Sequence, residues 1–340
     1  MKKYLIYNNI LLFIIIILLG SSCKKETVPP DNFEQGVWVK ISDMPQNRGG
    51  HTVNEINGKV YVIGGSPAEN TSLSISGMVF EWAANTWIEL PHHNNGKRIL
   101  HTSCVVEGKL YVLGGWTNDS LNSTSATMDM FNPQTGEWIS KKSMPTHRAN
   151  LTCAVIEGKI YVIGGMQNNP DGTLNYNGLK VVEMYDRVSD TWLQLQDMPT
   201  GRWGSSAVAV DGKIYVIGGR SASHVVLYSS IEVYDPETDS WSTKAGMPTE
   251  RYQLTTCLLD GKIYAIGGWK NSSTGPIYDK VEVYDPVNDA WITESPMPVS
   301  RAILASIAID GKILVYGGSR TNHPLIGTSA VYEFTQSSQH

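Results

Sequence analysis

A pair of adjacent glycines follows a Tyr-, Ile- and Val-rich run six times in this chain. The first glycines of successive pairs lie 50, 50, 54, 49 and 50 residues apart. A period of this size indicates one supersecondary unit copied along the chain, in which each copy buries its apolar face against the next. The pairs are Gly64-Gly65, Gly114-Gly115, Gly164-Gly165, Gly218-Gly219, Gly267-Gly268 and Gly317-Gly318.

A longer signature surrounds each pair and predicts four antiparallel strands. An arginine is followed by nine residues, Gly-Lys, four residues and Gly-Gly, at the same spacing in every copy. Strand a lies between the arginine and Gly-Lys, as at 102–106, and Gly-Lys marks a tight hairpin turn into strand b, as at 159–163. Strand c follows a variable loop, as at 281–284, and a Trp seven residues after its aromatic residue opens strand d. The arginines are Arg48, Arg98, Arg148, Arg202, Arg251 and Arg301.

The first and last copies complement one another. The sixth copy ends after Tyr332 with no Trp behind it, whereas Trp38 and Met44-Pro45 precede the first arginine and match a strand d that has no strand c. We therefore expect the N-terminal strand to complete the last repeat. That closure removes the exposed strand edges that a linear stack would leave.

These features together resemble the kelch family. Gly-Gly after four apolar residues, the aromatic residue and Trp seven apart, and Met-Pro shortly before the arginine all fit, over residues 37–335. The resemblance implies an all-β fold, a six-bladed kelch β-propeller closed by the N-terminal strand. The first copy departs from the pattern: Glu81, followed by Trp82, stands after the aromatic residue where the other copies that have a complete c–d turn carry Asp or Asn, and this leaves the c–d turn of the first blade open.

The first residues have the pattern of a targeting segment. Lys2 and Lys3 precede an apolar run, Ile10–Leu19, which suits a signal peptide and is shorter than the roughly 20 residues of a spanning helix. Residues 20–23 resemble a bacterial lipobox that would be cleaved and lipidated at Cys23, although Gly20 stands where the pattern has Leu. We expect a lipid-anchored protein of a bacterial cell envelope; a plain secreted protein and an uncleaved anchor are the alternatives. The expected organisation is a signal peptide (1–22), a lipidated tether (23–36), the propeller (37–335) and a tail (336–340).

The net charge and the positions of the cysteines and histidines limit which classes of function the sequence supports. The net charge is -5 and the pI about 5.9, so nothing suggests the basic face that nucleic acid would need. Cys104, Cys153 and Cys257 share no CxxC spacing and are expected to be small buried residues, with a disulfide or metal site as the alternative. His51 and His101 occupy one slot of the repeat, which favours a structural role. We expect no metal, no cofactor and a monomer.

Strand direction alternates within a blade, so the connections sort onto two faces. The a–b and c–d turns share one face, which we call the turn face; the b–c and d–a loops share the other, the loop face. From the second glycine of each pair to the aromatic residue of strand c, the distances are 15, 16, 20, 15, 16 and 14 residues. Variable loops on a rigid scaffold commonly carry binding, so we expect the ligand on the loop face.

Residues that differ between copies at the loop face are the candidate ligand contacts. Aromatic rings there would suit sugar rings or peptide side chains, or would pack on neighbouring loops. The arginines have two interpretations: structural pairs with carboxylates of strand c, or an electropositive mouth that favours an acidic ligand. The candidate ligand-binding residues are Arg148, Arg202, Arg251, Arg220, Trp116, Trp203, Tyr252 and Trp269.

The expected function is non-catalytic recognition of a protein, peptide or glycan on the loop face. The alternative is a sugar mutarotase, since the chain has a distant similarity to the N-acetylneuraminate epimerases, which are also six-bladed kelch-like proteins. Such a reaction needs a proton donor, a proton acceptor and a cation for the sugar carboxylate. The residues that could supply them are Glu250, His147, Arg202 and Arg251.

Overall fold

The computed structural model describes most of the repeat region and little of the chain before it. The described residues are 35–67, 77–82, 84–91, 98–117, 123–169, 171–221, 226–270, 275–320 and 327–336. The predicted signal peptide, Cys23 and nearly all of the tether lie outside them, as do residues 337–340 of the tail. Within the described ranges, no helix has the length and apolar character needed to cross a membrane.

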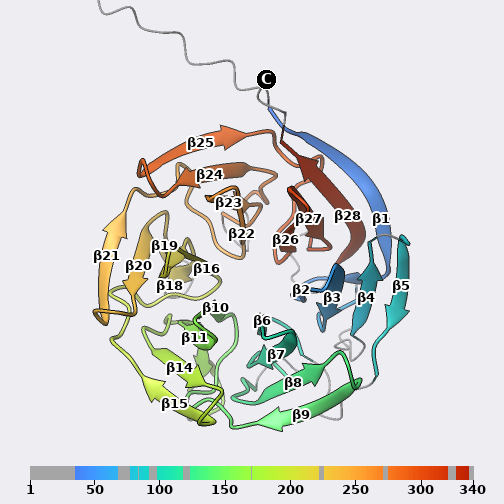
Figure 1. Ribbon diagram of the computed structural model, residues 1–340. Helices are drawn as coiled ribbons and strands as arrows, with labels where there is room; N and C mark the ends of the chain where they lie inside the picture. Colours follow the sequence, from blue (N-terminus) through green and yellow to red (C-terminus); the bar gives the residue numbers. More distant parts are fainter. Residues whose placement is uncertain are drawn as a thin grey trace, which may run out of the picture. The chain divides into compact units, whose positions relative to one another are not determined.

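Six four-stranded antiparallel sheets form a ring around a central axis (Figure 1). Blade 1 is β2 (Thr52–Ile56), β3 (Lys59–Ile63), β4 (Met78–Glu81) and β5 (Thr86–Glu89); blade 2 is β6 (Thr102–Val106), β7 (Lys109–Leu113), β8 (Met128–Asn132) and β9 (Glu137–Lys141). Blade 3 is β10 (Thr152–Ile156), β11 (Lys159–Ile163), β14 (Val182–Asp186) and β15 (Thr191–Gln194); blade 4 is β16 (Ser206–Val210), β17 (Lys213–Ile217), β20 (Ile231–Asp235) and β21 (Ser240–Lys244). Blade 5 is β22 (Thr255–Leu259), β23 (Lys262–Ile266), β24 (Val281–Asp285) and β25 (Ala290–Glu294).

The sixth blade is built from both ends of the described chain, as the sequence predicted. Its strand order is β1–β28–β27–β26, with β1 (Val37–Arg48), β26 (Ala305–Ile309), β27 (Lys312–Tyr316) and β28 (Thr328–Thr335). Trp38 pairs with Phe334, and their rings lie 5.0 Å apart. The N-terminal strand is longer than the repeat suggested and crosses two register shifts before it ends at Arg48.

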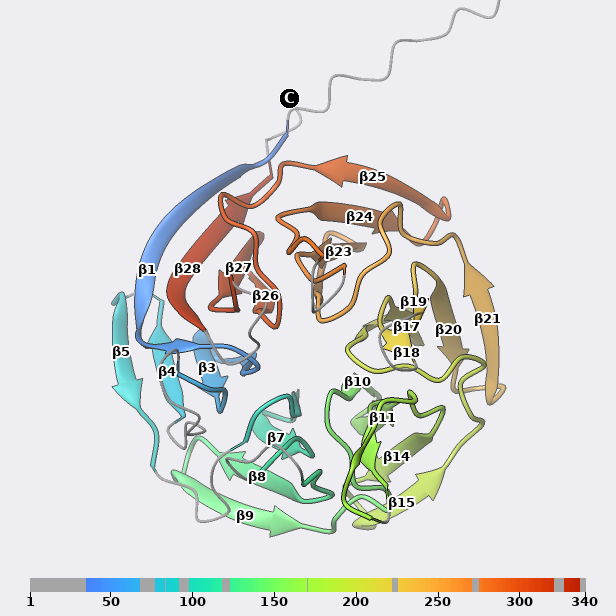
Figure 2. The same cartoon turned by 180° about the vertical axis from the view of Figure 1, so that it is seen from behind.

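Two short hairpins extend from the loop face of blades 3 and 4 (Figure 2). They are formed by β12 (Gln167–Asn168) with β13 (Leu174–Asn175), and by β18 (Arg220–Ser221) with β19 (Val226–Leu227). The first of them arises in the longest of the loops between strands b and c. Because of these hairpins, the loop face has projections that the uniform turn face lacks.

The two residues in front of each strand b form the a–b turn and determine its type. In blade 3, Ile156 pairs with Lys159, and Glu157 and Gly158 between them have φ values of 50° and 72°. Two successive positive φ values define a type I′ turn, whose twist matches that of the flanking strands. The first blade keeps the common c–d register, with Glu81 opposite Thr86, so the unusual Trp82 does not shift the strands.

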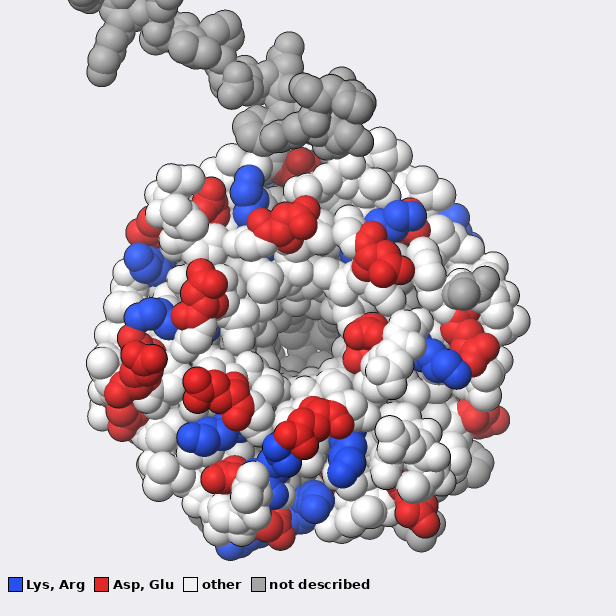
Figure 3. All heavy atoms as spheres, in the orientation of Figure 1, with Lys and Arg blue, Asp and Glu red and all other residues white. Residues whose placement is uncertain are grey.

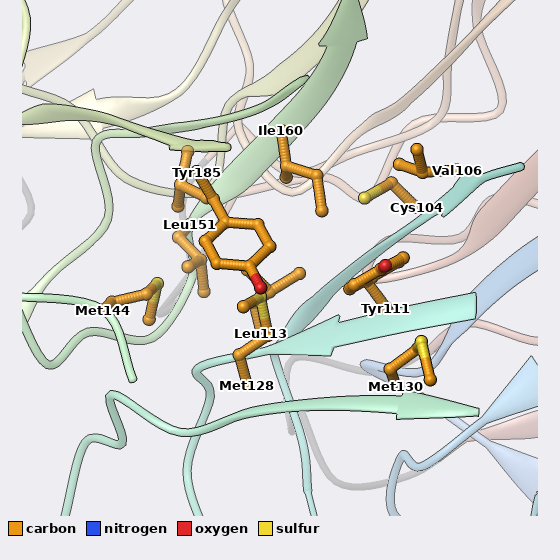
Figure 4. Packing of buried hydrophobic residues seen from close by; sticks show 11 residues of the cluster. Cys104, Val106, Tyr111, Leu113, Met128, Met130, Met144, Leu151, Ile160 and Tyr185 are labelled. Atoms are coloured by element: carbon orange, nitrogen blue, oxygen red, sulfur yellow. The ribbon is translucent and has the colours of Figure 1, made fainter. Parts of the chain in front are cut away.

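The Trp of each strand d joins neighbouring blades. The ring of Trp192 lies 5.1 Å from that of Tyr185 in its own blade, while its indole N–H donates to the Lys142 carbonyl of the segment that leaves the previous blade, at 2.9 Å. Trp138, Trp241 and Trp291 donate to the preceding segment in the same way. Side chains of both blades fill the seam itself, as Figure 4 shows for blades 2 and 3.

The Gly-Gly pairs are invariant because another backbone crosses them. A Cβ on Gly64 would lie 2.5 Å from the carbonyl oxygen of Arg98 in the next blade, so no side chain fits. The following amide, of Gly65, donates to that same carbonyl at 2.8 Å. Every pair meets the arginine of the next blade in this way, and the sixth pair meets Arg48 of the first.

A second set of bonds forms a closed ring at the axis, between the residues two places after the arginines. Each donates its amide N–H to the carbonyl of the equivalent residue in the preceding blade, at distances of 2.6 to 3.0 Å. The last bond, from Gly50 to the Ile303 carbonyl, joins blade 1 to blade 6. We call these residues the axial ring: Gly50, Leu100, Asn150, Gly204, Gln253 and Ile303.

All six residues of the axial ring have positive φ, between 48° and 68°. For an L-residue this region costs roughly 1–2 kcal/mol, and for β-branched Ile303 it is a marked outlier. The strain persists because leaving the region would break two bonds of the ring. The ring therefore couples each blade directly to both of its neighbours.

The axial ring leads to a test with a matched pair of glycines. Gly50→Ala places a Cβ 2.6 Å from Ile99 at a φ of 68°, whereas Gly58→Ala at 76° meets nothing within 4 Å. We expect Gly58→Ala to lower the free energy of unfolding by about 1 kcal/mol and Gly50→Ala by about 2–4 kcal/mol, because crowding adds to the backbone strain. Denaturant unfolding measures both, and equal losses would contradict the tight closure at Gly50.

Candidate functional site

The six arginines lie inside the blades rather than at an open mouth. Each arginine residue is at most 3% exposed. Five of them donate to the carbonyl of the first glycine of their own Gly-Gly pair, as Arg202 does to Gly218 at 2.9 Å, and Arg251 donates to Ala265 instead. The backbone carbonyl of each arginine thus bonds to the preceding blade, and the arginine side chain bonds within its own blade.

Carboxylates of strand c accompany the arginines of blades 2 to 5. Asp129, Glu183, Glu232 and Glu282 form the four ion pairs, all buried, and the Arg202–Glu232 and Arg251–Glu282 pairs both measure 2.8 Å. In blade 6, Arg301 lies over the ring of Tyr332 at 4.9 Å and donates to the Ala330 carbonyl. Burial lowers the pKa of Arg301 and of Arg48 to about 10, so both stay charged at neutral pH.

This arrangement matches the structural interpretation of the arginines. Arg148, Arg202 and Arg251 were candidate ligand contacts, and the side chain of each is 0% exposed. In this conformation they offer no surface to a ligand, so we leave them out of the proposed site. Their charge is also compensated within the blade, which removes the basis for an electropositive mouth in blades 2 to 5.

The candidate aromatic residues do come together at the loop side of the axis. Trp203 meets Tyr252 edge-on at 5.4 Å, and Tyr252 lies 5.7 Å from Trp269. All are buried, Trp116 at 8% exposure being the most open of them. They belong to one apolar cluster, which we call the axial cluster: Ile99, Leu100, Trp116, Ala149, Met166, Trp203, Tyr252, Trp269, Ala302 and Ile303.

Arg220 is inserted into the axial cluster as a buried cation. Its guanidinium carbon lies 4.7 Å from the centre of the Trp203 ring and 4.5 Å from that of Tyr252. A desolvated cation–π contact contributes about 2 kcal/mol or more, and here two rings share one charge. Trp203 is fixed in turn by its indole N–H, which donates to the Tyr176 carbonyl at 3.0 Å.

Two indole groups of the axial cluster differ from that of Trp203. The Nε1 atoms of Trp116 and Trp269 are buried and have no acceptor among the residues that the structure describes. An unsatisfied buried donor costs about 1–3 kcal/mol, and such groups in native proteins commonly mark a functional site. These two donors are therefore the unsatisfied polar groups of the axial cluster that need an explanation.

The four residues of the mutarotase hypothesis divide into two exposed side chains and two buried ones. Glu250 and His147 are exposed in the loops before the arginines of blades 5 and 3, and His147 Nδ1 lies 2.8 Å from Thr124 Oγ1. Arg202 and Arg251 are buried in their ion pairs. Over the described part of the chain, no group of three His, Cys, Asp or Glu side chains could hold a metal.

A cavity of about 200 Å³ lies on the axis, on the turn-face side of the axial cluster. Every blade lines it with residues two to five places after its arginine, and none of the four candidate aromatic residues is among them. Sequence reasoning missed this space because it treated the small residues of strand a as crowded packing. The signal was there: Ser and Thr recur at the fourth and fifth places, as at Thr102 and Ser103.

Beside the cavity, His51 and His101 pack between blades. A Cβ on Gly317 or Gly64 would lie 2.7 or 2.6 Å from the respective ring. Burial, with Arg48 or Arg98 nearby, lowers the pKa of each to about 3. His101 Nε2 lies 3.1 Å from Thr52 Oγ1, whereas neither ring nitrogen of His51 has a partner among the described residues.

The cysteines are packing residues, as expected. Cys104 and Cys257 are buried, Cys153 is partly exposed, and all three are free thiols. Burial raises the pKa of Cys257 to about 12. Cys153 accepts a hydrogen bond from Thr102 Oγ1 at 3.1 Å, across the seam between blades 2 and 3.

Comparison with known proteins gives the family. A model described as the KLHDC2/KLHL20/DRC7 kelch-repeats domain matches residues 50–244 and 101–318. Beta-scruin of Limulus polyphemus is 26% identical over 192 residues, which are 55% of this chain and 20% of that protein. Kelch-like protein terF of Aspergillus terreus is 30% identical over 197 residues, 55% of this chain and 42% of that protein. The matches thus span less than half of these relatives.

A solved structure has the same architecture. The structure titled "Structure of YjhT" aligns with a TM-score of 0.71 over 86% of this chain and 95% of that chain. The sequences are 18% identical in that alignment, so the likeness concerns the fold.

The buried ion pairs predict a large stability effect. Removing one partner of such a pair costs about 3–5 kcal/mol because the other charge stays buried. We expect Arg202→Ala to lower the free energy of unfolding by this amount. The control is Lys213→Ala, which breaks the exposed pair with Asp235 and should cost much less, because solvent screens such a pair. Denaturant unfolding of both variants is the measurement, and similar small losses would contradict the structural role of Arg202.

His51 predicts acid sensitivity. Its folded pKa of about 3 lies below the ordinary value of 6.5, so the unfolded state binds an extra proton as the pH falls. Stability is therefore complete above pH 6.5 and declines below it, by about 1.4 kcal/mol per pH unit for this group. His51→Leu copies the residue that blades 3, 5 and 6 have in this slot and should flatten the decline. Unfolding measured from pH 7 to pH 4 tests this; an unchanged slope would assign the decline to other groups.

Proposed function

The chain belongs to the kelch-repeat family, and we propose that it is a non-catalytic binding protein of a bacterial cell envelope. Its ligand is a protein, peptide or glycan rich in hydrogen-bond acceptors, bound on the loop face above the axial cluster. Lipid on Cys23 anchors it to the membrane. Loss of fatty-acid labelling in Cys23→Ser tests the anchor separately from the binding site.

One observation carries the proposal: the buried indole donors of Trp116 and Trp269 that lack an acceptor among the described residues. Both rings belong to the packed axial cluster with Tyr252 and Trp203, and this packing preorganises the two indole groups. A carbonyl or hydroxyl oxygen of a ligand would satisfy them, and the apolar rings beside them would cover a sugar face or an aliphatic side chain.

Two further features support the loop face. The hairpins β12–β13 and β18–β19 project there and differ from the short turns of the opposite face. Arg220, which begins β18, places a buried positive charge beside Trp203 and Tyr252 and favours a ligand with acidic or strongly polar oxygens.

The mutarotase alternative has less support. That reaction needs an acid and a base within hydrogen-bond reach of one sugar ring. Glu250 and His147 are exposed on separate blades, and neither lines the axial cavity. The cation assigned to the sugar carboxylate, Arg202 or Arg251, already pairs with a glutamate. We therefore propose binding without turnover.

Glycan and peptide arrays probed with the full-length protein would identify a ligand, whose affinity is then measured for Trp→Phe variants. Trp116→Phe/Trp269→Phe removes both unsatisfied N–H groups and keeps the ring stacking. We expect about a tenfold or larger loss of affinity at an unchanged melting temperature. Trp192→Phe is the matched control, because it removes an indole donor from the outer strand β15 and should leave affinity unchanged.

Two results would overturn the proposal. Equal affinity of the double variant and the control would remove the loop-face site. Accelerated anomeric exchange of N-acetylneuraminate, measured by NMR, would make the protein an enzyme.

A further inference from the structure

The axial cavity on the turn-face side is distinct from the loop-face site proposed above. Its lining comes from all six blades, whereas the candidate aromatic residues of the axial cluster lie outside it. Its volume of about 200 Å³ is below the roughly 300–1,000 Å³ of pockets for drug-sized molecules. A small or slender ligand is the kind that fits.

The cavity floor contains a polar group that is not satisfied. Gln253 and Asn150 of the axial ring line the cavity, and Gln253 Nε2 donates to Asn150 Oδ1 at 3.1 Å, from blade 5 to blade 3. Gln253 is 8% exposed, and its Oε1 accepts no hydrogen bond from any residue the structure describes. The floor therefore contains a buried acceptor with no donor among the described residues, and a ligand that donates would satisfy it.

The hydroxyl groups of the wall are largely engaged between blades. Thr255 and Ser306 share a hydrogen bond of 2.9 Å across blades 5 and 6, and Ser206 and Thr256 share one of 2.8 Å across blades 4 and 5. Nearer the turn face, the seventh residue after the arginine is apolar in five blades, with Leu258 the most exposed. The passage between floor and rim thus suits methylene groups better than further charges. These apolar residues are Val105, Val155, Ala209, Leu258 and Ala308.

Carboxylates surround the outer end of the passage. Figure 3 shows acidic side chains all around the central hollow on this face. The first position of the a–b turn is acidic in five blades; in blade 1 it is Asn57, and Glu55 lies two residues before it. The five are Glu107, Glu157, Asp211, Asp260 and Asp310, and with Glu55 we call them the acidic rim.

Part of the nearby positive charge is paired away from the acidic rim. In blades 1 and 6, the lysine that follows the turn pairs with a carboxylate of strand c: Lys59 with Glu81 at 2.6 Å, and Lys312 with Glu333 at 2.9 Å. Lys213 pairs with Asp235 in the same way. Within the rim, Glu107 forms an ion pair with Arg187. The mouth of the passage consequently keeps a negative field, which attracts cations and repels anions.

We propose that the axial cavity binds a linear aliphatic polyamine. One ammonium end donates to Gln253 Oε1, the methylene groups lie along the apolar stretch, and the remaining ammonium charge faces the acidic rim. Such a ligand has a donor at each end, one for the acceptor of the floor and one for the carboxylates of the mouth. Its slender apolar chain matches the apolar passage between them. Neutral polyols lack the charge for the rim, and anions are repelled by it.

Isothermal titration of the full-length protein with spermidine at low ionic strength tests the proposal, with glycerol and citrate as the neutral and anionic probes. We expect one spermidine per chain, with affinity that falls as salt is added, and no binding of glycerol or citrate. Several weak equivalent sites, or no heat of binding, would overturn the proposal, because either result leaves no defined site on the axis.

Variants taken from the repeat itself locate the site. Gln253→Leu installs the residue that blade 2 has at this place and should lower affinity about tenfold or more, since a charge-assisted hydrogen bond is lost. Asp211→Asn/Asp260→Asn installs the amide that blade 1 has in this turn, at the surface, and should lower affinity about threefold with a weaker salt dependence.

The control removes the same charge elsewhere. Glu137→Gln/Asp197→Asn alters two exposed carboxylates away from the acidic rim and should leave affinity unchanged. Equal losses in the rim and control variants would overturn the proposal in favour of diffuse attraction to an acidic protein. Because the rim variants leave the buried floor intact, they keep the test decisive even if Gln253→Leu fails to fold.

Discussion

The closed ring of six backbone hydrogen bonds at the axis is the constraint on which the rest of the structure depends. Each residue of the axial ring bonds to both neighbouring blades, and Gly50, two residues after the end of β1, supplies the bond that returns to blade 6. The Gly-Gly pairs add a second circle of bonds, from each blade to the arginine carbonyl of the next. Both circles close because β1 completes the sixth sheet. A repeat that in a linear stack would leave two open ends becomes one cooperative body.

The axial ring also separates two environments. The residue before each ring position contributes to the loop side, where Trp203, Tyr252 and Trp269 pack with buried Arg220 between two of their rings. The residues after it line the polar cavity that faces the acidic rim. Charge is divided in the same way: the arginines of blades 2 to 5 are neutralised inside the blades, while the turn-face carboxylates remain around the axis. One layer of strained backbone thus stands between an apolar, donor-rich side and a polar, anionic one.

The sequence predicted what depends on period and on local turn chemistry: the six blades, the tight hairpin turns at Gly-Lys, and the closure of the last blade by the N-terminal strand that carries Trp38. It predicted that Trp116, Trp203, Tyr252 and Trp269 meet at one end, but not that they would be buried against each other. It left open whether the arginines face outward. The axial ring had no sequence signal, because Leu100, Gln253 and Ile303 adopt positive φ with no glycine to announce it. The cavity below the ring was missed for a different reason: the Ser and Thr residues of strand a that line it were interpreted as crowded packing.

Native-state hydrogen exchange of the six axial-ring amides tests the central claim most directly. If the ring is one closed element, these amides exchange only through global unfolding, with equal free energies of opening and the same denaturant dependence. Equal protection of Gly50 and Gly204, which lie in blades 1 and 4, is the decisive comparison. Faster exchange at Gly50, with a free energy of opening well below that of Gly204, would show that the ring opens at its closing bond, and would contradict the account.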